Sequence, residues 1–248
     1  MAANTGCTLN VGSDGNIHAN RTIGLSGQAQ LMGDAATVTT TIKDEHGGIK
    51  GDPITEAQPV LYPVETCPDY TESIPGSPYY TKPDFTIGKG ATYKMPPGTY
   101  SFRDFEVTGN ATVIIDIPDD SPVKTVTIYL SGELDIGGQG GPNPTPTIAN
   151  TERNAAALSF VACNRGAEPN IVPWKLAGGT DAYFTVYAPN NNVDLAGGSS
   201  VFGAIVGNVF TATGGAQVHY DVALGVVNDP SAQQVSAIMP RSWRQLLR

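Results

Sequence analysis

The sequence predicts an all-β protein, and three observations lead to that prediction. A seven-residue phrase recurs along the chain: apolar, small, Gly, any residue, small or polar, any residue, apolar. The 248 residues include 29 Gly and 19 Pro, an excess that favours many turns. Only 15% of the residues are charged and helix formers such as Lys, Glu and Leu are scarce, which argues against long helices. The 40% hydrophobic content argues against disorder, because it can fill a core.

The spacing of the phrase indicates stacked coils. From Leu176 to Leu195 to Ala212 the steps are 19 and 17 residues, the length of a coil with two or three short strands. One such coil cannot bury its apolar face alone, so neighbouring coils must stack and pair their strands. We therefore predict a right-handed parallel β-helix, with an antiparallel sandwich as the alternative; Asp14-Gly15 is the only clear hairpin signal. The copies are Leu25–Leu31, Val107–Val113, Leu130–Ile136, Leu195–Val201, Ala212–Val218 and a degenerate copy from Leu176 to Gly179.

Along the chain, the pattern predicts one domain over residues 1–248. Many prolines and few alternating apolar residues mark about 50–83 as an excursion across the surface. Residues 241–248 form the one convincing helical stretch, and a helical cap at about 240–248 would cover an open end of the stack. The remaining expected elements are strands in Cys7–Val38, a β-prone run at Thr37–Thr41, strands in Phe85–Ile136, a loop at Gly137–Pro146 and buried strands at Ala155–Ala162 and Tyr183–Ala188.

Charge and targeting features exclude several classes of protein. The net charge of −9 would repel phosphate backbones, so we expect no nucleic-acid partner. No apolar run is long enough to span a membrane, and the first residues do not form a signal peptide. If the protein is exported, its export segment is absent from this chain. Cys7 and Cys67 could pair and leave Cys163 free, although the sequence does not fix the connectivity.

Several phrases in the second half of the chain resemble a known family. They are Met95–Phe102, Phe105–Val113, Val126–Ile136, Val186–Asn190, Val193–Gly197, Val201–Val206, Val218–Asp221 and Ser242–Arg244. Together they resemble the β-helical domain of bacterial exported proteins that begin with a PilX-type or Tad-type pilin-like segment. The resemblance covers about residues 85–248, and 7–34 more loosely. It implies a cell-surface or pilus (fimbrium) location and a structural or adhesive role, with no established enzymatic activity. This chain lacks the family's pilin-like N-terminal helix.

Two groups of residues near the end of the chain are candidates for a site. His219, Tyr220 and Asp221 form a triplet in which His219 and Asp221 would project from the same face of a strand. The triplet fits half of a catalytic triad, but no partner phrase supports catalysis, and a polar ladder in the last coil is the favoured interpretation. Trp243 and Arg244 belong to the amphipathic tail, whose Trp would pack as part of the cap.

Carboxylates are the other chemical candidates, because β-helical polysaccharide enzymes use them as acids or to hold calcium. The candidates are Asp116, Asp119, Asp120, Asp135, Asp181 and Asp194. Asp119, Asp120 and Asp194 are weak candidates for a calcium site, and no other cofactor is expected. No basic residue stands beside the carboxylate pairs in the sequence, which disfavours a lyase. The threonines at 37, 39 and 41 make too short a row for an ice-binding face.

We therefore predict a secreted, non-catalytic structural or adhesive protein of the bacterial cell surface, associated with a pilus or filament. Its expected partners are other copies of itself, further surface or pilus proteins, and surface polysaccharide. The alternatives are a polysaccharide-active enzyme (lyase or glycosidase) and a carbohydrate- or ice-binding module.

Overall fold

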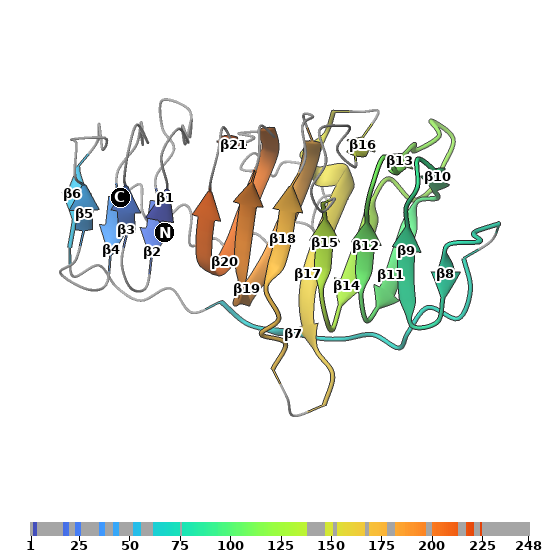
Figure 1. Ribbon diagram of the computed structural model, residues 1–248, viewed down its shortest axis with the longest axis horizontal. Helices are drawn as coiled ribbons and strands as arrows, with labels where there is room; N and C mark the ends of the chain where they lie inside the picture. The colour runs from blue at the N-terminus through green and yellow to red at the C-terminus, as the bar shows by residue number, and fades with distance from the viewer. Residues whose placement is uncertain are drawn as a thin grey trace.

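The protein is all-β in its computed structural model, with the strands in a row along the long axis of the molecule (Figure 1). Within the described residues, the one helical element is a 3₁₀ turn, η1 (Ala155–Ala157). No helix among these residues is long and apolar enough to cross a membrane. The structure describes residues 2–3, 17–19, 23–25, 35–37, 42–44, 52–55, 62–74, 76–137, 147–150, 153–166, 169–177, 182–196, 200–212, 217–220 and 224.

The described strands form three sheets. The 15-stranded main sheet contains β5 (Ile42–Asp44), β3 (Ile23–Leu25), β1 (Ala2–Ala3), β20 (Ser200–Ala212), β19 (Ala182–Ala196), β18 (Trp174–Ala177), β15 (Leu134–Ile136), β12 (Phe105–Val107), β9 (Asp84–Ile87) and β8 (Tyr80–Thr81) in that order. Connected to this path are β11 (Gly98–Phe102), β14 (Val126–Leu130), β17 (Leu158–Asn164), β7 (Glu65–Thr66) and β21 (Gln217–Tyr220). The second sheet is β10 (Thr92–Met95), β13 (Thr112–Ile115) and β16 (Thr147–Asn150), and the third is β2 (Ile17–Ala19), β4 (Ala35–Thr37) and β6 (Pro53–Ile54).

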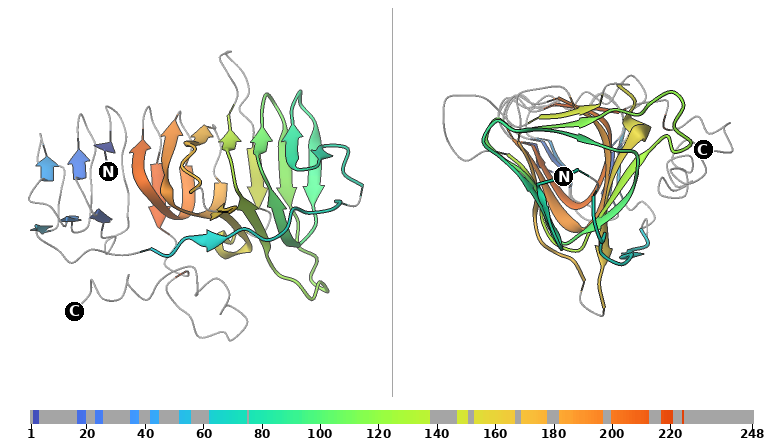
Figure 2. Two further views of the ribbon diagram at one scale, coloured as in Figure 1. Left: turned by 90° about the horizontal axis from the view of Figure 1, so that it is seen from below. Right: turned by 90° about the vertical axis from the view of Figure 1, so that its right-hand side faces the viewer.

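Strands from successive passes of the chain lie side by side and in register. Phe105 of β12 pairs with Phe85 of β9 on one side and with Leu134 of β15 on the other. In the described residues every strand pair is parallel except β8 with β9, which is antiparallel, so the main sheet is mixed. Viewed along the long axis, the ribbon has a three-sided outline around a common interior (Figure 2).

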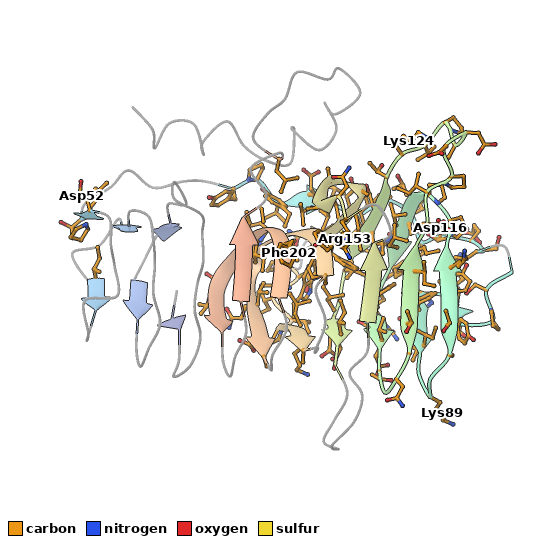
Figure 3. The ribbon with its side chains drawn as sticks, turned by 90° about the horizontal axis from the view of Figure 1, so that it is seen from above. Asp52, Lys89, Asp116, Lys124, Arg153 and Phe202 are labelled. Atoms are coloured by element: carbon orange, nitrogen blue, oxygen red, sulfur yellow. A yellow bond between two sulfur atoms is a disulfide. The ribbon has the colours of Figure 1, made fainter. Side chains whose placement is uncertain are left out.

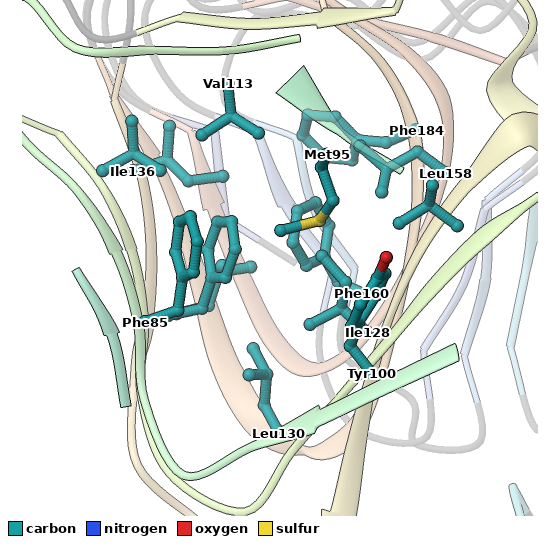
Figure 4. Packing of buried hydrophobic residues seen from close by; sticks show 14 of the residues in the cluster. Phe85, Met95, Tyr100, Val113, Ile128, Leu130, Ile136, Leu158, Phe160 and Phe184 are labelled. Atoms are coloured by element: carbon teal, nitrogen blue, oxygen red, sulfur yellow. The ribbon is translucent and has the colours of Figure 1, made fainter. Parts of the chain in front are cut away.

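Alternating side chains fill that interior. In β14 the side chains of Val126, Ile128 and Leu130 are buried, whereas those of the residues between them are partly exposed, as expected for one face turned inward. Aromatic rings stack along the interior: Phe85 and Phe105 lie 4.9 Å apart at 9° between ring planes. Figure 4 shows Phe85 and Phe160 among the aliphatic side chains of the same core. Burial of this continuous apolar column is the main stabilising term of the fold.

Several expected boundaries differ from the structure. The strand expected from Ala155 begins at Leu158, because Asn154 accepts a hydrogen bond from the backbone N–H of Ala156 and caps the turn η1. The excursion expected at 50–83 includes the short strands β6, β7 and β8. Its described part from 62 onward, which we call the strap, runs along the outside of the strands (Figure 1). The helical cap at 240–248 and the loop at 137–146, apart from Gly137, lie outside the described residues.

A disulfide fixes the strap to the body. Cys67 in the strap is bonded to Cys163 at the end of β17, 96 residues later in the chain. The pairing of Cys67 with Cys7 is therefore wrong for this structure, and Cys7 itself lies outside the described residues. The sequence could not give this result, because the strap meets β17 only after the chain has completed the coils between them. Beside the disulfide, β7 pairs in parallel with the end of β17.

Two buried tyrosines make stability fall at alkaline pH. Burial raises the pKa of Tyr100 and of Tyr187 to about 12, from a usual value of about 10. Between pH 10 and 12 the unfolded chain therefore loses these protons while the folded chain keeps them, and the free energy of unfolding decreases. In that window each tyrosine lowers the free energy of unfolding by up to about 1.4 kcal/mol per pH unit. Below pH 10 neither tyrosine lowers it. In urea titrations the Tyr100→Phe/Tyr187→Phe variant should lose less stability than the wild type between pH 9 and 11.5; equal losses would contradict the assignment.

Candidate functional site

The structure does not gather the predicted calcium ligands. Asp119 and Asp120 lie in the exposed loop after β13, whereas Asp194 lies on β19 in the main sheet. The Lys124 ammonium donates to the backbone carbonyls of Pro118 (3.2 Å) and Asp119 (2.6 Å), so a cation already occupies these loop oxygens. Figure 3 shows Lys124 at the tip of this loop. The described residues contain no group of three or more His, Cys, Asp or Glu side chains that could hold a metal.

The residues predicted near the C-terminal end are only partly described. His219 and Tyr220 belong to β21, where they lie beside Phe202 and Gly203 of β20. Asp221, Trp243 and Arg244 lie outside the described residues, so the predicted ladder and cap stay predictions.

A row of charged residues crosses four neighbouring strands of the main sheet. Glu106 on β12 is in register with Asp135 on β15, Asp135 with Lys175 on β18, and Lys175 with Asp194 on β19. The residues on either side of Asp135 and of Lys175 are buried, so the side chains of the row are on the outer face. Glu133, the residue before β15, is the fifth member, because it forms an ion pair with Lys175. We call these five residues the charged row.

Lys175 is the centre of the charged row. Its Nζ donates to Glu133 Oε1 at 3.0 Å and lies 3.8 Å from Asp135 Oδ2. The hydrogen bond to Glu133, together with the charges of Glu133 and Asp135, raises the pKa of Lys175. Burial raises the pKa of Asp135, which the Lys175 charge opposes and the Glu133 charge reinforces. At neutral pH the lysine therefore stays protonated and holds two carboxylates together on the surface.

Sequence reasoning identified Asp135 and Asp194 as candidate carboxylates but missed their basic partner. Lys175 is 40 positions after Asp135, because the chain between them passes through β16, η1 and β17 before it returns to the same face. The signal was the degenerate phrase at Leu176, whose first residue pairs with Leu195, the first residue of the next copy. Superposing these two copies would have placed Lys175 beside Asp194, as the register does.

Replacing Lys175 tests this electrostatic arrangement. The Lys175→Met variant should show a higher pKa for Asp135 in an NMR titration of its carboxyl carbon, since the charge that lowers it is gone. The free energy of unfolding should change by less than about 1 kcal/mol, because the ion pairs are exposed. The matched control is Lys94→Met: Lys94 pairs with Asp116 at 2.8 Å in the second sheet. A control that shifts Asp135 equally, or a Lys175 variant that does not shift it, would refute the arrangement.

A second polar arrangement fixes the strap beside the disulfide. The Arg165 guanidinium lies 3.7 Å from the centre of the Tyr70 ring and donates to the Pro68 carbonyl and to Ser101 Oγ. Further along, the hydroxyl of Tyr187 donates to the Pro63 carbonyl. These contacts link the strap to β11, β17 and β19. They make up a structural clamp, since Arg165 Nη2 and the Tyr187 hydroxyl donate to the chain itself, whereas Arg165 Nε is buried without a partner among the described residues.

Partly exposed aromatic rings also align across two strands. Tyr183 of β19 and Phe202 of β20 are in register, with ring centres 4.8 Å apart and 14° between planes. Each ring covers one face of the other, so this contact supports the pairing of the two strands. Of the threonine row considered for ice binding, only Thr37 lies within the described residues.

Comparison with known proteins gives a family for this architecture. A family model described as a domain of unknown function, DUF7305, matches residues 65–227, which extend from β7 past β21. Neither the curated proteins nor the solved structures give a significant match.

Proposed function

The chain belongs to the DUF7305 family, whose domain spans most of the stacked strands, and we propose that it is a non-catalytic structural or adhesive module of the bacterial cell surface. The observation that carries the proposal is the long stack of in-register strands with an external strap, held by the Cys67–Cys163 disulfide. Such a stack is stiff and presents broad polar flanks. Both properties suit a scaffold that makes contacts along its length.

The finer fold in this proposal is a right-handed parallel β-helix. The parallel registers that link β9, β12, β15, β18, β19 and β20 support it, since each strand repeats the face of the one before. Right-handedness is favoured because parallel crossover connections are right-handed in about 98% of cases. The antiparallel β8 would then be a terminal addition to the helix rather than one of its coils.

An extracellular location is supported by the disulfide, because such bonds persist in oxidising compartments and are rare in the cytosol. Association with a pilus or filament is the further part of the proposal, and it is carried by the resemblance of the phrases to PilX-type and Tad-type proteins. The partners in this proposal are further copies of the chain, other surface proteins and surface polysaccharide.

The test is to locate the protein and its thiols in the source cells. Cells are quenched in acid and alkylated, and the protein is followed in cytoplasmic, surface-sheared and medium fractions. We expect it in the sheared fraction, with Cys67 and Cys163 protected from alkylation until reduction. Immunogold labelling of the sheared material should mark filaments. A cytoplasmic protein with both cysteines alkylated would overturn the proposal.

The charged row supports a second candidate, a polysaccharide-active enzyme. Asp135 and Glu133 flank one ammonium, and the raised pKa of Asp135 is a property of general acids. If Lys175 were the base of a lyase, however, it would have to be neutral, and the carboxylates raise its pKa. The row therefore fits a surface ion-pair network better than a catalytic centre.

Incubation with bacterial surface polysaccharides distinguishes the two candidates. New reducing ends or unsaturated products that disappear in Asp135→Asn, and persist in the matched Asp116→Asn variant of the second sheet, would favour the enzyme. Sedimentation of the intact polysaccharide with the protein, without cleavage, would favour the adhesive module.

A further inference from the structure

One edge of the main sheet is completed by two segments from opposite parts of the sequence. The long strand β20 pairs through Ser200–Gly203 with β21, and through Thr211 and Ala212 with β1. β21 comes from residues 217–220 and β1 from residues 2–3, yet both lie on the same edge of β20. The layer after β20 is therefore composite. In it, β1 occupies the place that the chain following β21 would take in an uninterrupted stack.

The first part of the chain continues the stack beyond this layer. Ala2 pairs with Gly24 of β3, and Gly24 with Lys43 of β5, always in parallel. In the third sheet β2, β4 and β6 repeat the same order. The described strands β1 to β6, which we call the N-terminal stack, precede the family domain at 65–227 and lie against its β20 edge through β1. Figure 1 shows them as the blue strands beside β20.

The opposite end of the molecule is closed to such stacking. β8 runs antiparallel along β9, and the rings of Tyr79 and Tyr80 pack against the core there. The strap covers the edge of β11, where the backbone N–H of Thr71 donates to the Ser101 carbonyl and Ser101 N–H donates to Thr71 Oγ1. At this end the main sheet therefore finishes in an antiparallel strand that differs from the parallel coils. The β20 edge is filled by β1 and β21 of the same chain, so strands of another copy can join there only by replacing them.

The connection between the N-terminal stack and the body passes through one short segment. β6 ends at Ile54, and the strap is held from Pro63 by Tyr187 and at Cys67 by the disulfide. The N-terminal stack is thus joined to a fixed point near β19 by roughly 8 residues, a reach of about 27 Å when extended. Among the described residues, its strand pairing with the body is the β1–β20 ladder of Ala2 with Thr211 and Ala3 with Ala212. A parallel backbone ladder of this kind can form between two chains as well as within one.

We propose that the β1–β20 junction is an exchange surface, at which the N-terminal stack of one copy docks on the β20 edge of a second copy. The chemistry is strand addition, in which the parallel backbone ladder seen within one chain forms between two. Reciprocal exchange closes a dimer, and non-reciprocal exchange extends a chain of copies. The biological meaning of this exchange rests on the assembly role proposed above. The exchange itself can be measured with the purified protein.

Cross-linking of mixed single-cysteine variants tests the exchange. Ala3 and Ala212 are register partners, so their Cα atoms lie about one strand spacing apart, roughly 4.8 Å, within disulfide range. The variants Ala3→Cys and Ala212→Cys, each in a Cys7→Ser background, are mixed and oxidised mildly. Exchange should give a disulfide-linked heterodimer on a non-reducing gel, at several times the yield of either variant alone. The matched control replaces Ala212→Cys by Lys89→Cys, an exposed residue in the distant β9–β10 turn.

The double variant Ala3→Cys/Ala212→Cys provides the reference for the junction. Cross-linking inside this chain, without a heterodimer in the mixture after prolonged incubation at high concentration, would overturn the exchange while leaving the proposed surface location untouched. Failure of the double variant to cross-link would overturn the junction itself. A cytoplasmic location of the protein in its source cells would refute the proposed function without affecting the cross-linking result.

Discussion

Reduction of the Cys67–Cys163 disulfide is expected to lower the free energy of unfolding by about 3–5 kcal/mol. The bond joins positions 96 residues apart, and in the chain-entropy model a closed loop of about 100 residues restricts the unfolded chain by about 4.7 kcal/mol. Cys163 is fully buried at the end of β17, so reduction also leaves a thiol in a packed site. The strap should then separate from the body before the rest of the stack unfolds, since its remaining anchors are a two-residue ladder and single hydrogen bonds of about 1 kcal/mol each.

Urea unfolding with and without a reducing agent measures this effect. The Cys67→Ala/Cys163→Ala variant should reproduce the shift in midpoint, and Cys7→Ser should leave it unchanged. Limited proteolysis of reduced protein should cut first between residues 68 and 74. An unchanged midpoint, or first cleavage within β14 or β17, would show that the disulfide does not hold the strap.

The repeated phrase made much of the fold predictable. Alternation of buried and partly exposed residues in segments such as Val126–Leu130 is a local property, so it is readable from sequence. The phrase also located the turn after Leu130 and the strand that ends at Ile136. It could not show which end of the chain stacks on which strand. That arrangement depends on long-range pairing, such as Ala2 with Thr211, for which no local pattern exists.

The candidate site was less predictable for a related reason. The loops between coils vary in length, so that Glu106 is followed by its neighbour Asp135 after 29 positions and Asp135 by Lys175 after 40. Spacing rules that work for a fixed repeat fail when the coils differ by this much. Charged side chains on the outer face leave no hydrophobic pattern to align. Only the register of the buried residues on either side brings the row together.

Among the described glycines, Gly203 is the position at which an added methyl group should destabilise the fold most. It lies in β20 beside Phe184 of β19, with a φ of +156° that non-glycine residues rarely adopt. A Cβ there would lie 1.9 Å from the Phe184 carbonyl oxygen and 2.9 Å from its carbonyl carbon. Both atoms belong to the backbone of a paired strand, so they cannot move away without breaking the β19–β20 ladder. We therefore expect Gly203→Ala to cost roughly 4 kcal/mol or more, the sum of overpacking and backbone strain.

Gly166 provides the matched control for this substitution. It also has a positive φ, +81°, but a Cβ there would meet no atom within 4 Å. Gly166→Ala should therefore show only the backbone term, roughly 1–2 kcal/mol, and the difference between the two variants in urea unfolding isolates the steric clash. If Gly203→Ala fails to fold, Gly207→Ala gives an intermediate point, since its Cβ would lie 3.0 Å from a Val193 methyl group. Equal destabilisation at Gly203 and Gly166 would show that β19 and β20 do not lie as closely as the ladder requires.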